Sequence, residues 1–566
     1  MLPLPHSRPV SLTGVISLFL TCSLSAATFW VSPDGDDMAA GTRDHPWATP
    51  QHAVTAVMAG DTVYFRHGTY ALDGPILPRV SGTAEAPITL AGYPGESAIF
   101  DGSGFHHADE TYKKGLLHLE GVVHYALKNL HVRNSWHGFG IKVSGHASHI
   151  DILECTSAET FGPGIGFWNS EFIRVMYCEV TGANTNRRRV YGDPTTQAAH
   201  EGISSGGSRH FEIAYNHVHH CDKEGIDVKE ASAHGTVHHN YVHHLPRQGL
   251  YADAWFGLLE NVTFHHNVVH DCEWGVAINT EGVGADLRGV AVHHNLLHDN
   301  RGSGIHSGLW GVNGPRSDLL IAHNTLYANG SAGQYSGPTG NIDIRSPQSQ
   351  RVRVFNNLCV AGGTFELGAF ADAATPAGAA LLAAREVSFS HNFIGQFVPI
   401  SATDVAGITP RQRERYHRAY ALAGDNPVFG HAELQDPDRG NFWLGATSAA
   451  RRAGLIDPEF HGLGQTEPPD LGAFDFGQDL IPLPAPAIEH ILDDVWRVVH
   501  RTQPGRATIR QRSDDQGETW TSAAVPAVGQ GIPDIHYFRH SDNAPFPQFR
   551  YTVVTDPAER VRFKHL

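Results

Sequence analysis

The sequence predicts an all-β protein of 566 residues: a parallel β-helix with an N-terminal cap, followed by a small C-terminal β domain. Three observations lead to this fold class. The chain holds 60 Gly and 33 Pro but only 4 Met, a balance that favours turns over long helices. A unit of strand, Asn, strand and Gly recurs through its middle, and no helical pattern separates the strands. Short strands repeated in this way indicate a solenoid whose coils stack about 4.8 Å apart.

The composition limits the possible partners. Hydrophobic residues make up 41% and charged residues 17%, which is typical of a folded protein. The formal net charge of −17 disfavours nucleic acid and anionic membranes, because both require a basic surface. Beyond residue 27, no apolar run approaches the roughly 20 residues of a membrane helix. We therefore expect a monomer with no nucleic-acid partner and no transmembrane segment.

The N-terminal residues 1–27 have the pattern of a secretory signal peptide. Arg8 is the basic residue before an apolar stretch that runs from Val15 to Leu24. The small residues that follow, up to Ala27, suit a signal peptidase. We expect cleavage near Ala27 and secretion to the periplasm or the exterior.

Two columns of residues define the repeat. Neighbouring members of a column are mostly 23 to 29 residues apart. The first column is Asn129, Cys155, Cys178, Asn216, Asn240, Asn267, Asn295, Asn324, Asn357 and Asn392. The second column pairs Gly with an aliphatic residue, as in Gly202-Ile203, Gly225-Ile226, Gly249-Leu250 and Gly275-Val276. A leucine-rich repeat would need Leu-x-x-Leu-x-Leu, which is missing.

The asparagine column has a physical reason. In a stacked turn, each side-chain amide can bond its equivalent one coil along, which satisfies polar groups that would otherwise cost about 1–3 kcal/mol each. Cys155 and Cys178 stand in this column as small hydrophobes. The sequence predicts no disulfide scaffold, because five cysteines remain after the signal and none forms a Cys-x-x-Cys pair.

The ends of the repeat region resemble those of secreted right-handed, single-stranded β-helix proteins. The N-terminal segment from Phe29 to Tyr70 is similar to their cap and first coil, and it would cover the open end of the solenoid. Closing segments are expected at Asn426–Phe429, Asn441–Leu444 and Asp470–Phe474, and a capping helix at Pro410–Ala421. The β-helix domain is therefore predicted over residues 28–480.

A Pro-rich linker over Pro482–Ala487 separates a second predicted domain. Residues 488–566 are expected to form a small β-sandwich-like unit. Within it, Ser513–Trp520 fits the Asp-box hairpin pattern Ser-x-Asp-x-Gly-x-x-Trp. A single such motif is expected to stabilise a turn.

The candidate site lies where the coils are richest in ionisable residues. Alignment on the Gly-aliphatic step places Glu201, Glu224 and Gln248 in one row, just before the Gly. Two residues after the Gly, the row is Ser204, Asp227, Tyr251 and Ala277; four after, it is Gly206, Lys229, Asp253 and Asn279, with Glu281 two further. Strand alternation places the last two rows on one face. We therefore expect a two-by-two patch of Asp227, Lys229, Tyr251 and Asp253.

The segment Lys223-Glu-Gly-Ile-Asp227 resembles the calcium-binding Asp-Asp-Gly-aromatic-Asp motif of the family 9 pectate lyases. These enzymes use Ca²⁺ to neutralise a uronate carboxylate and a lysine on a neighbouring coil as the base. The resemblance implies Glu201, Glu224 and Asp227 as Ca²⁺ ligands. Lys223 departs from the motif, since it replaces a carboxylate, and Tyr251 stands at the position of the catalytic lysine.

Three functions remain open from the residues. A lyase that acts on an acidic, uronate-containing polysaccharide needs a base, and Lys229 or Tyr251 serves if a neighbouring cation lowers its pKa. An inverting glycoside hydrolase needs two carboxyls roughly 6.5–9.5 Å apart, for which Asp227 and Asp253 are candidates. The third possibility is a glycan-binding surface protein without catalysis.

Further residues are expected to bind the glycan. An insertion over residues 184–194 interrupts the repeat just before Glu201, and insertions in solenoids form loops that often line a binding face. Its Arg187, Arg188 and Arg189 offer forked donors for carboxylates, and its Tyr191 can stack on a sugar ring. Asn279 and Glu281 extend the site by one coil.

The histidines form repeated pairs, which are predicted to stack in register. The clearest are His238-His239, His265-His266 and His293-His294, each followed by an Asn of the column. Stacked imidazoles can bind transition metals. We expect them instead to line a strand and turn, because no carboxylate or cysteine lies at ligand spacing along the sequence.

Overall fold

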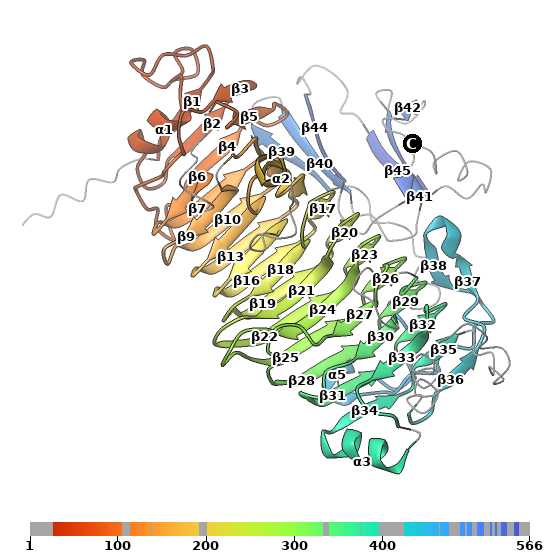
Figure 1. Ribbon diagram of the computed structural model, residues 1–566. Coiled ribbons are helices and arrows are strands. Elements are labelled where there is room, and N and C mark those ends of the chain that lie inside the picture. Colours follow the sequence, from red (N-terminus) through yellow and green to blue (C-terminus); the bar gives the residue numbers. More distant parts are fainter. Residues whose placement is uncertain are drawn as a thin grey trace, which may run out of the picture.

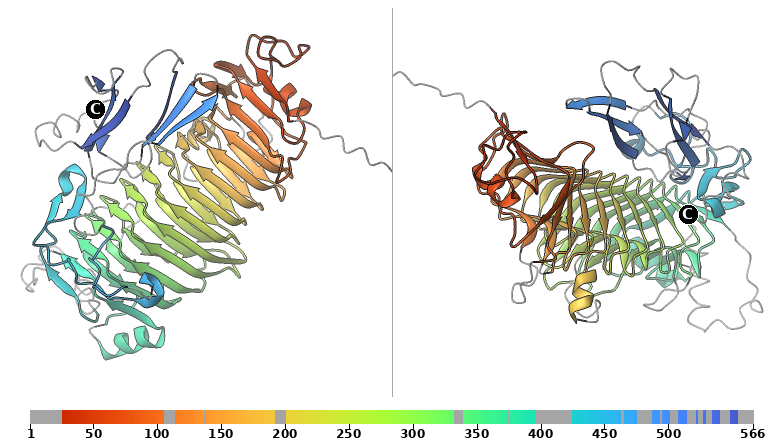
Figure 2. Two further views of the ribbon diagram at one scale, coloured as in Figure 1. Left: turned by 180° about the vertical axis from the view of Figure 1, so that it is seen from behind. Right: turned by 90° about the horizontal axis from the view of Figure 1, so that it is seen from above.

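The chain folds as a long stack of short parallel strands (Figures 1 and 2). The computed structural model describes residues 26–104, 114–136, 138–191, 201–331, 339–373, 375–395, 424–462 and 465–474, and then the backbone of the strands from β39 onward. Three parallel sheets of 13, 13 and 10 strands run along the stack, and most coils contribute one strand to each of them. The predicted right-handed β-helix is therefore confirmed.

The sheets are named here A, B and C. Sheet A contains β1 (Thr28–Val31), β2 (Thr62–Phe65), β4 (Ile88–Gly92), β7 (Val123–Lys128), β10 (Ser148–Leu153), β13 (Glu171–Met176), β16 (Arg209–Ala214), β19 (Ala233–His238), β22 (Leu258–His265), β25 (Asp286–His293), β28 (Arg316–Ala322), β31 (Ser349–Phe355) and β34 (Val387–Ser390). Sheet B contains β3 (Gly68–Ala71), β5 (Ala98–Asp101), β8 (Leu130–Arg133), β11 (Thr156–Ala158), β14 (Glu179–Thr181), β17 (His217–His219), β20 (Tyr241–His243), β23 (Val268–His270), β26 (Leu296–His298), β29 (Thr325–Tyr327), β32 (Leu358–Val360), β35 (Phe393–Gly395) and β36 (Val428–Gly430). Sheet C contains β6 (Gly115–Glu120), β9 (Phe139–Ser144), β12 (Ile165–Trp168), β15 (Ile203–Gly206), β18 (Ile226–Lys229), β21 (Gln248–Ala254), β24 (Trp274–Thr280), β27 (Ile305–Ser307), β30 (Gly340–Ile344) and β33 (Phe365–Ala369).

Aliphatic and aromatic side chains from all three sheets fill the interior as one continuous core. In sheet C, Ile203, Ile226 and Leu250 are paired in register from coil to coil, and all three are fully buried. This register fixes the face of every other residue, because side chains alternate along a strand. The polar residues between them consequently lie on the outer face of sheet C.

The asparagine column forms the predicted ladder between sheets A and B. Each amide donates from Nδ2 to Oδ1 of the next coil's asparagine, as from Asn216 to Asn240 at 2.9 Å and from Asn240 to Asn267 at 3.0 Å. The ladder continues in the same way to Asn392. The members from Asn216 onward are fully buried, so the ladder satisfies polar groups inside the stack.

A second ladder, not anticipated from the sequence, begins in the turn after sheet B and ends on β30 of sheet C. Asn300 donates to Asn329 at 2.8 Å, and Asn329 donates to Asn341 at 2.9 Å. The described cysteines are free and buried, in agreement with their reading as small hydrophobes. Cys178 joins the first ladder through its backbone N–H, which donates to Asn216 Oδ1 at 2.9 Å.

Both ends of the β-helix carry additional elements. Helix α1 (Pro50–Ala56) buries Ala53 and Val54 in the core at the N-terminal end. Strand β36 extends sheet B as its last member, whereas β37 (Leu434–Asp436) and β38 (Asn441–Leu444) pair antiparallel. The remaining helices are α2 (Thr185–Tyr191), α3 (Pro376–Ala384), the short α5 (Pro458–His461) and a 3-10 turn at Pro437–Arg439. The described helices are all too short to span a membrane.

The C-terminal strands pair antiparallel among themselves. One set joins β39 (Ala487–Leu492), β40 (Val495–His500) and β44 (Asp534–Arg539); the other joins β41 (Ala507–Ser513), β42 (Thr521–Ser522), β43 (Ala527–Val528) and β45 (Gln548–Val553). Several expected features lie outside the described residues: most of the signal peptide, the Pro410–Ala421 helix, nearly all of the linker, and the Asp-box after Ser513.

Candidate functional site

The rows expected from the sequence are present in the register of sheet C. Asp227 pairs with Tyr251, and Lys229 pairs with Asp253, on the adjacent strands β18 and β21. The next strand, β24, places Asn279 beside Asp253. The patch therefore follows from one repeated step along the solenoid, because equivalent positions of successive coils form rows.

Lys229 lies at the centre of this patch. Its Nζ is 3.0 Å from Glu201 Oε1, 3.6 Å from Asp227 Oδ2 and 3.7 Å from Asp253 Oδ2. The three carboxylates come from consecutive coils, one before β15, one on β18 and one on β21. A single ammonium group thus compensates acidic side chains of three coils.

The patch is buried, although its side chains lie on the outer face of sheet C. Asp227 is 0% exposed, Asp253 2%, Tyr251 3% and Lys229 7%. At the rim, the Trp255 indole donates to Asp253 Oδ2 at 2.8 Å while 47% of that tryptophan remains exposed. A substitution within the patch therefore leaves buried charges without partners, rather than changing an exposed surface.

The electrostatics also correct the proposed lowering of a base pKa. Burial alone would lower the pKa of Lys229, but Glu201, Asp227 and Asp253 outweigh it and hold that pKa well above the ordinary value. Burial raises the pKa of Tyr251 well above its usual range, and the negative charges of Asp253 and Glu281 add to the shift. Lys229 is consequently an ammonium and Tyr251 a neutral phenol at neutral pH.

Tyr251 belongs to a chain of hydrogen bonds that crosses into the next coil. Its hydroxyl donates to Glu281 Oε1 and accepts from Asn279 Nδ2 at 3.2 Å. Arg316 in turn donates from Nη1 to Asn279 Oδ1 at 3.2 Å, and it is fully buried. Burial raises the pKa of Glu281, so this carboxylate has increased affinity for a proton. The structure thereby brings both predicted residues of that coil, Asn279 and Glu281, to Tyr251.

Carboxylate oxygens of the kind that hard cations bind surround Lys229. Among the described residues, Glu224 Oε2, Asp253 Oδ1 and both carboxylate oxygens of Asp227 accept no hydrogen bond, although all three side chains are buried. Unsatisfied carboxylate oxygens in a group are the donor set that Ca²⁺ takes. The residues therefore fit a calcium ion, with Lys229 as the internal cation that would compete for these oxygens.

Lys223, which replaces a carboxylate of the calcium motif, has different electrostatic surroundings from Lys229. Burial lowers its pKa, against the opposing effect of Glu224, and Arg247 and Arg187 lower it further. Arg247 donates from Nε to Glu224 Oε1 at 3.2 Å. Arg247 therefore binds Oε1 of Glu224, while Oε2 of Glu224 accepts no hydrogen bond among the described residues.

The insertion begins as helix α2, where a loop was expected. Arg187 is 2% exposed and packs its guanidinium over the Phe161 ring, 5.3 Å from the centroid. Arg189 bonds Glu159 at 2.6 Å and donates to Asn186 at 2.8 Å. The side chains of Arg188 and Tyr191 lie outside the described part of the chain. Arg187 and Arg189 therefore have intramolecular partners, which a glycan would have to share.

Aromatic residues beside the patch were not anticipated. Trp310 makes edge contacts with Tyr251 at 6.0 Å and with Trp274 at 4.6 Å between ring centroids. His306 lies 5.3 Å from the Trp310 ring, and its Nδ1 is 3.5 Å from Asp343 Oδ2. Trp310 follows the short strand β27 within an irregular turn, so the repeat rows do not include it.

The histidine stacking is confirmed. The rings of His265 and His293 lie 5.1 Å apart with an interplanar angle of 1°, and those of His239 and His266 lie 4.9 Å apart at 3°. The expectation that no carboxylate lies near the histidines is wrong at several places. Glu212 Oε1 is 2.9 Å from His238 Nε2, and Asp271 Oδ2 is 2.6 Å from His270 Nδ1. His219 Nε2 is 3.1 Å from Glu179 Oε1, although these two residues are 40 positions apart in the sequence and meet only through the stacking of coils.

Two family models match this chain. The first, described as "Pel9A-like, right handed beta helix region", matches residues 29–186, and the second, "Right handed beta helix region", matches residues 115–289. They confirm the predicted similarity to right-handed β-helices of the pectate lyase type.

Curated relatives match over shorter segments. Pectate lyase PEL9 of Emericella nidulans is 38% identical over 120 residues, which is 20% of this chain and 29% of that protein. The uncharacterized protein YwoF of Bacillus subtilis is 33% identical over 133 residues, 22% of this chain and 27% of that one. The matched segments thus span less than a third of either relative.

Among solved structures, the crystal structure of pectate lyase Pel9A covers 80% of this chain and 98% of its own. Its TM-score is 0.44 and its sequence identity 15%.

Proposed function

We propose that the protein is a secreted carbohydrate-active enzyme that cleaves a uronate-containing polysaccharide by β-elimination, with the buried charged patch of sheet C as its active site. The observation that carries the proposal is the Lys229 ammonium held among carboxylates of three coils, beside the Tyr251–Glu281 hydrogen bond. Perturbed ionisable groups gathered at one place are typical of active sites. The segment matched by a pectate lyase relative is consistent with this chemistry.

Elimination at a 4-linked uronide requires three contributions. A base removes the proton on carbon 5, a positive charge stabilises the carboxylate as it gains negative charge, and an acid protonates the departing oxygen on carbon 4. Lys229 is protonated, so it supplies positive charge and the acid proton rather than acting as the base.

Tyr251 and Glu281 together supply the base. As the carbon–hydrogen bond breaks, the Tyr251 oxygen takes the carbon 5 proton and its own hydroxyl proton moves to Glu281. The electron pair forms the double bond between carbons 4 and 5, and the bond to the leaving oxygen breaks. Proton exchange with water then restores both residues. Because the phenol gives up its proton as it accepts another, no free phenolate is required.

We also propose that Glu201, Glu224 and Asp227 hold a calcium ion, with Asp253 beside them. When bound, the ion would neutralise the uronate carboxylate. The support is the set of buried carboxylate oxygens of Glu224, Asp227 and Asp253 that accept no hydrogen bond among the described residues. Calorimetry with CaCl₂ tests this, and Asp227→Asn should weaken binding at least tenfold. Absence of calcium binding by the wild type would refute it.

An inverting hydrolase is the second candidate, since Asp227 and Asp253 are both buried with pKa values raised mainly by burial. Such a pair needs space for a water molecule between its carboxyls. Here the Lys229 ammonium lies within 3.7 Å of an oxygen of each. This arrangement favours the lyase.

One assay separates the candidates. The purified protein is incubated with a panel of uronate-containing and neutral polysaccharides, while ultraviolet absorbance and reducing ends are recorded. A lyase produces both, because elimination creates a conjugated double bond in the new terminal uronide. Reducing ends without absorbance would indicate the hydrolase, and absence of both across the panel would leave the glycan-binding function.

A further inference from the structure

Most of the stacked histidines have a backbone explanation. His220, His239, His244, His266 and His294 all have φ between 51° and 54°, in the left-handed region. Asn, Asp and His are the side chains most enriched there after glycine. Two turns recur with this conformation, one after sheet A and one after sheet B, so these histidines repeat for a conformational reason.

His217, His219 and His243 lack this explanation, because they belong to strands of sheet B. His217 and His219 flank Val218 on β17, whose side chain is buried in the core. The two histidines therefore face outward together. His243 occupies the position of His219 on the next coil, and Glu179 occupies that of His217 on the preceding coil.

The three histidines converge, and Glu179 lies at the edge of their group. His217 Nε2 is 2.8 Å from His243 Nε2, and one ligand nitrogen from each of His217, His219 and His243 lies within 4.8 Å of the others. Glu179 Oε1 lies 3.1 Å from His219 Nε2 and 3.8 Å from His217 Nδ1. The side chains of His217 and Glu179 are 28% and 48% exposed, so an ion can reach them from solvent.

We propose that His217, His219, His243 and Glu179 bind a divalent transition metal ion, Zn²⁺ or Cu²⁺, across three coils of sheet B. Three imidazoles and one carboxylate complete a tetrahedral zinc set, in which each nitrogen lies about 2.0–2.1 Å from the ion. Ligating nitrogens then stand about 3.3 Å apart, so the His217–His243 pair needs to open by only a few tenths of an ångström. Imidazole ligands favour copper and zinc over calcium, which distinguishes this site from the carboxylate patch on sheet C.

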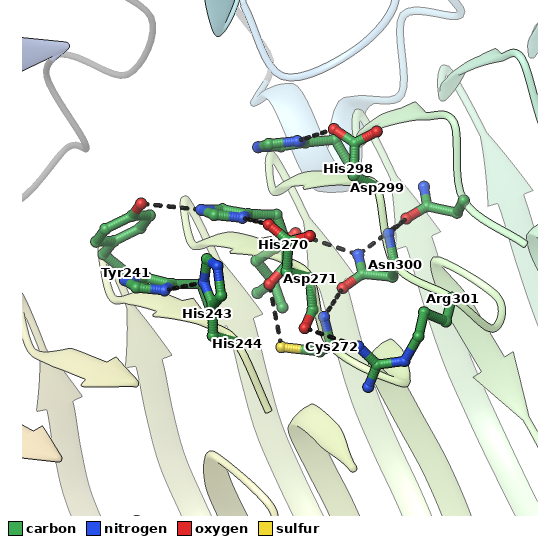
Figure 3. Close-up of polar contacts among 12 residues, drawn as sticks. Tyr241, His243, His244, His270, Asp271, Cys272, His298, Asp299, Asn300 and Arg301 are labelled. Carbon is green, nitrogen blue, oxygen red and sulfur yellow. Dashed lines mark hydrogen bonds and ion pairs between the residues drawn. The ribbon is translucent and has the colours of Figure 1, made fainter. Parts of the chain in front are cut away.

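A second group of side chains is less suitable for a metal ion (Figure 3). His244, His270 and Asp271 also lie close together. However, His270 bonds Tyr241 through Nε2 at 2.9 Å and Asp271 through Nδ1 at 2.6 Å, so both of its nitrogens are engaged by neighbours of other kinds. A metal there would have to displace one of these bonds. The first cluster instead places two imidazole nitrogens against each other.

The test uses the full-length secreted protein without a histidine tag, stripped of metal with a chelator. Calorimetric titration with ZnCl₂ and with CuCl₂ should show one strong site per chain, and Co²⁺ should give the visible spectrum of a tetrahedral nitrogen-rich site. The double variant His217→Gln/His243→Gln should weaken this binding at least a hundredfold, and Glu179→Gln about tenfold. Glu179→Gln alters one half-exposed side chain, so it still reports on the site if the double variant does not fold.

His265→Gln/His293→Gln is the matched control. It removes two stacked imidazoles 5.1 Å apart on sheet A, which belong to neither cluster of convergent ligands found among the described residues. Retained binding in this control, with loss in His217→Gln/His243→Gln, would support the site. Equal binding by both double variants, or absence of a strong site in the wild type, would refute it. Neither outcome depends on the glycan, so the result is independent of the proposed lyase activity.

Discussion

The same coils bury polar groups in two opposite ways. In the first asparagine ladder, every amide from Asn216 to Asn357 donates to the next coil and accepts from the one before. On sheet C, the same stacking places Asp227 and Asp253 one coil apart, yet oxygens of both accept no hydrogen bond among the described residues. A repeated asparagine satisfies its own hydrogen bonds from coil to coil, whereas the acids and the lysine of the patch leave acceptor oxygens without a hydrogen bond.

This difference separates a structural region from the region of the proposed active site. Buried polar groups are nearly always paired, and the exceptions require a reason such as a ligand or catalysis. The ladder needs no ligand, because its donors and acceptors are complete. The patch retains acceptor oxygens that a cation, a substrate hydroxyl or water would satisfy. Substitutions in the two regions should therefore separate stability from turnover.

The largest effect is expected for Lys229→Ala. It removes the ammonium that faces Glu201, Asp227 and Asp253, so turnover should fall at least a hundredfold. Breaking a buried ion pair by removing one partner also destabilises proteins by about 3–5 kcal/mol. Turnover on the glycan identified by the panel and urea denaturation measure the two effects. Lys128→Ala, at an exposed position of β7, is the control that should change neither.

Tyr251→Phe should sharpen the distinction, because it removes one hydroxyl and little else. We expect turnover to fall ten- to a hundredfold, through loss of the proton path to Glu281. The stability change should be near 1 kcal/mol, the scale of one hydrogen bond. Steady-state kinetics and urea denaturation of the same preparation provide the measurement. Unchanged turnover would exclude Tyr251 from the chemistry.

The repeat made the fold and the rows of the site predictable. Asn216, Asp227 and Tyr251 were placed correctly because one register step fixes every equivalent position in a solenoid. Burial of the patch was not predictable from the rows. Side chains outside the rows contact the patch, such as Trp255, whose indole donates to Asp253, and Trp310, whose ring contacts Tyr251.

The pKa directions were missed for a related reason. The sequence shows Lys229 near Lys223, which suggested that a neighbouring cation lowers a lysine pKa. In the fold, Lys229 instead faces three carboxylates of different coils, and these raise its pKa against the effect of burial. Whether acids or bases surround a side chain depends on side-chain direction, which spacing alone does not give.

Asn267→Ala tests the structural side of the comparison. It leaves the buried Asn240 backbone N–H without its acceptor, and it removes the side-chain donor to Asn295 Oδ1 and to the Val237 carbonyl. We expect a loss of about 3 kcal/mol in the free energy of unfolding, since each unsatisfied buried group costs about 1–3 kcal/mol. Turnover of the folded enzyme should stay within twofold. His239→Asn, in the adjacent turn, keeps a residue that tolerates the left-handed backbone and should change both quantities little. A large drop in turnover for Asn267→Ala would contradict the separation of the two regions.

The smallest effect concerns Glu366, a carboxyl that ends the second ladder without a cation. Asn341 donates to its Oε2, and the Gly362 N–H donates to its Oε1 at 3.1 Å. Burial nevertheless raises its pKa from 4.5 to about 7. A carboxyl whose pKa is higher in the folded than in the unfolded state favours folding when protonated. Its contribution is therefore complete below pH 4.5 and is lost as the pH rises through about 7.

Glu366→Gln keeps the shape and cannot ionise, so it should match the wild type near pH 4 and exceed its stability at pH 8. We expect a difference of about 1 kcal/mol, because the side chain is partly exposed. Urea denaturation at both pH values provides the measurement, and Glu386→Gln, at an exposed position nearby, is the control that should show no such change. A larger advantage at pH 4 than at pH 8 would reverse the sign and show that this carboxyl is stabilised as an anion. The end of the second ladder would then hold a buried negative charge without a cation, and the contrast between the two regions would rest on Lys229 alone.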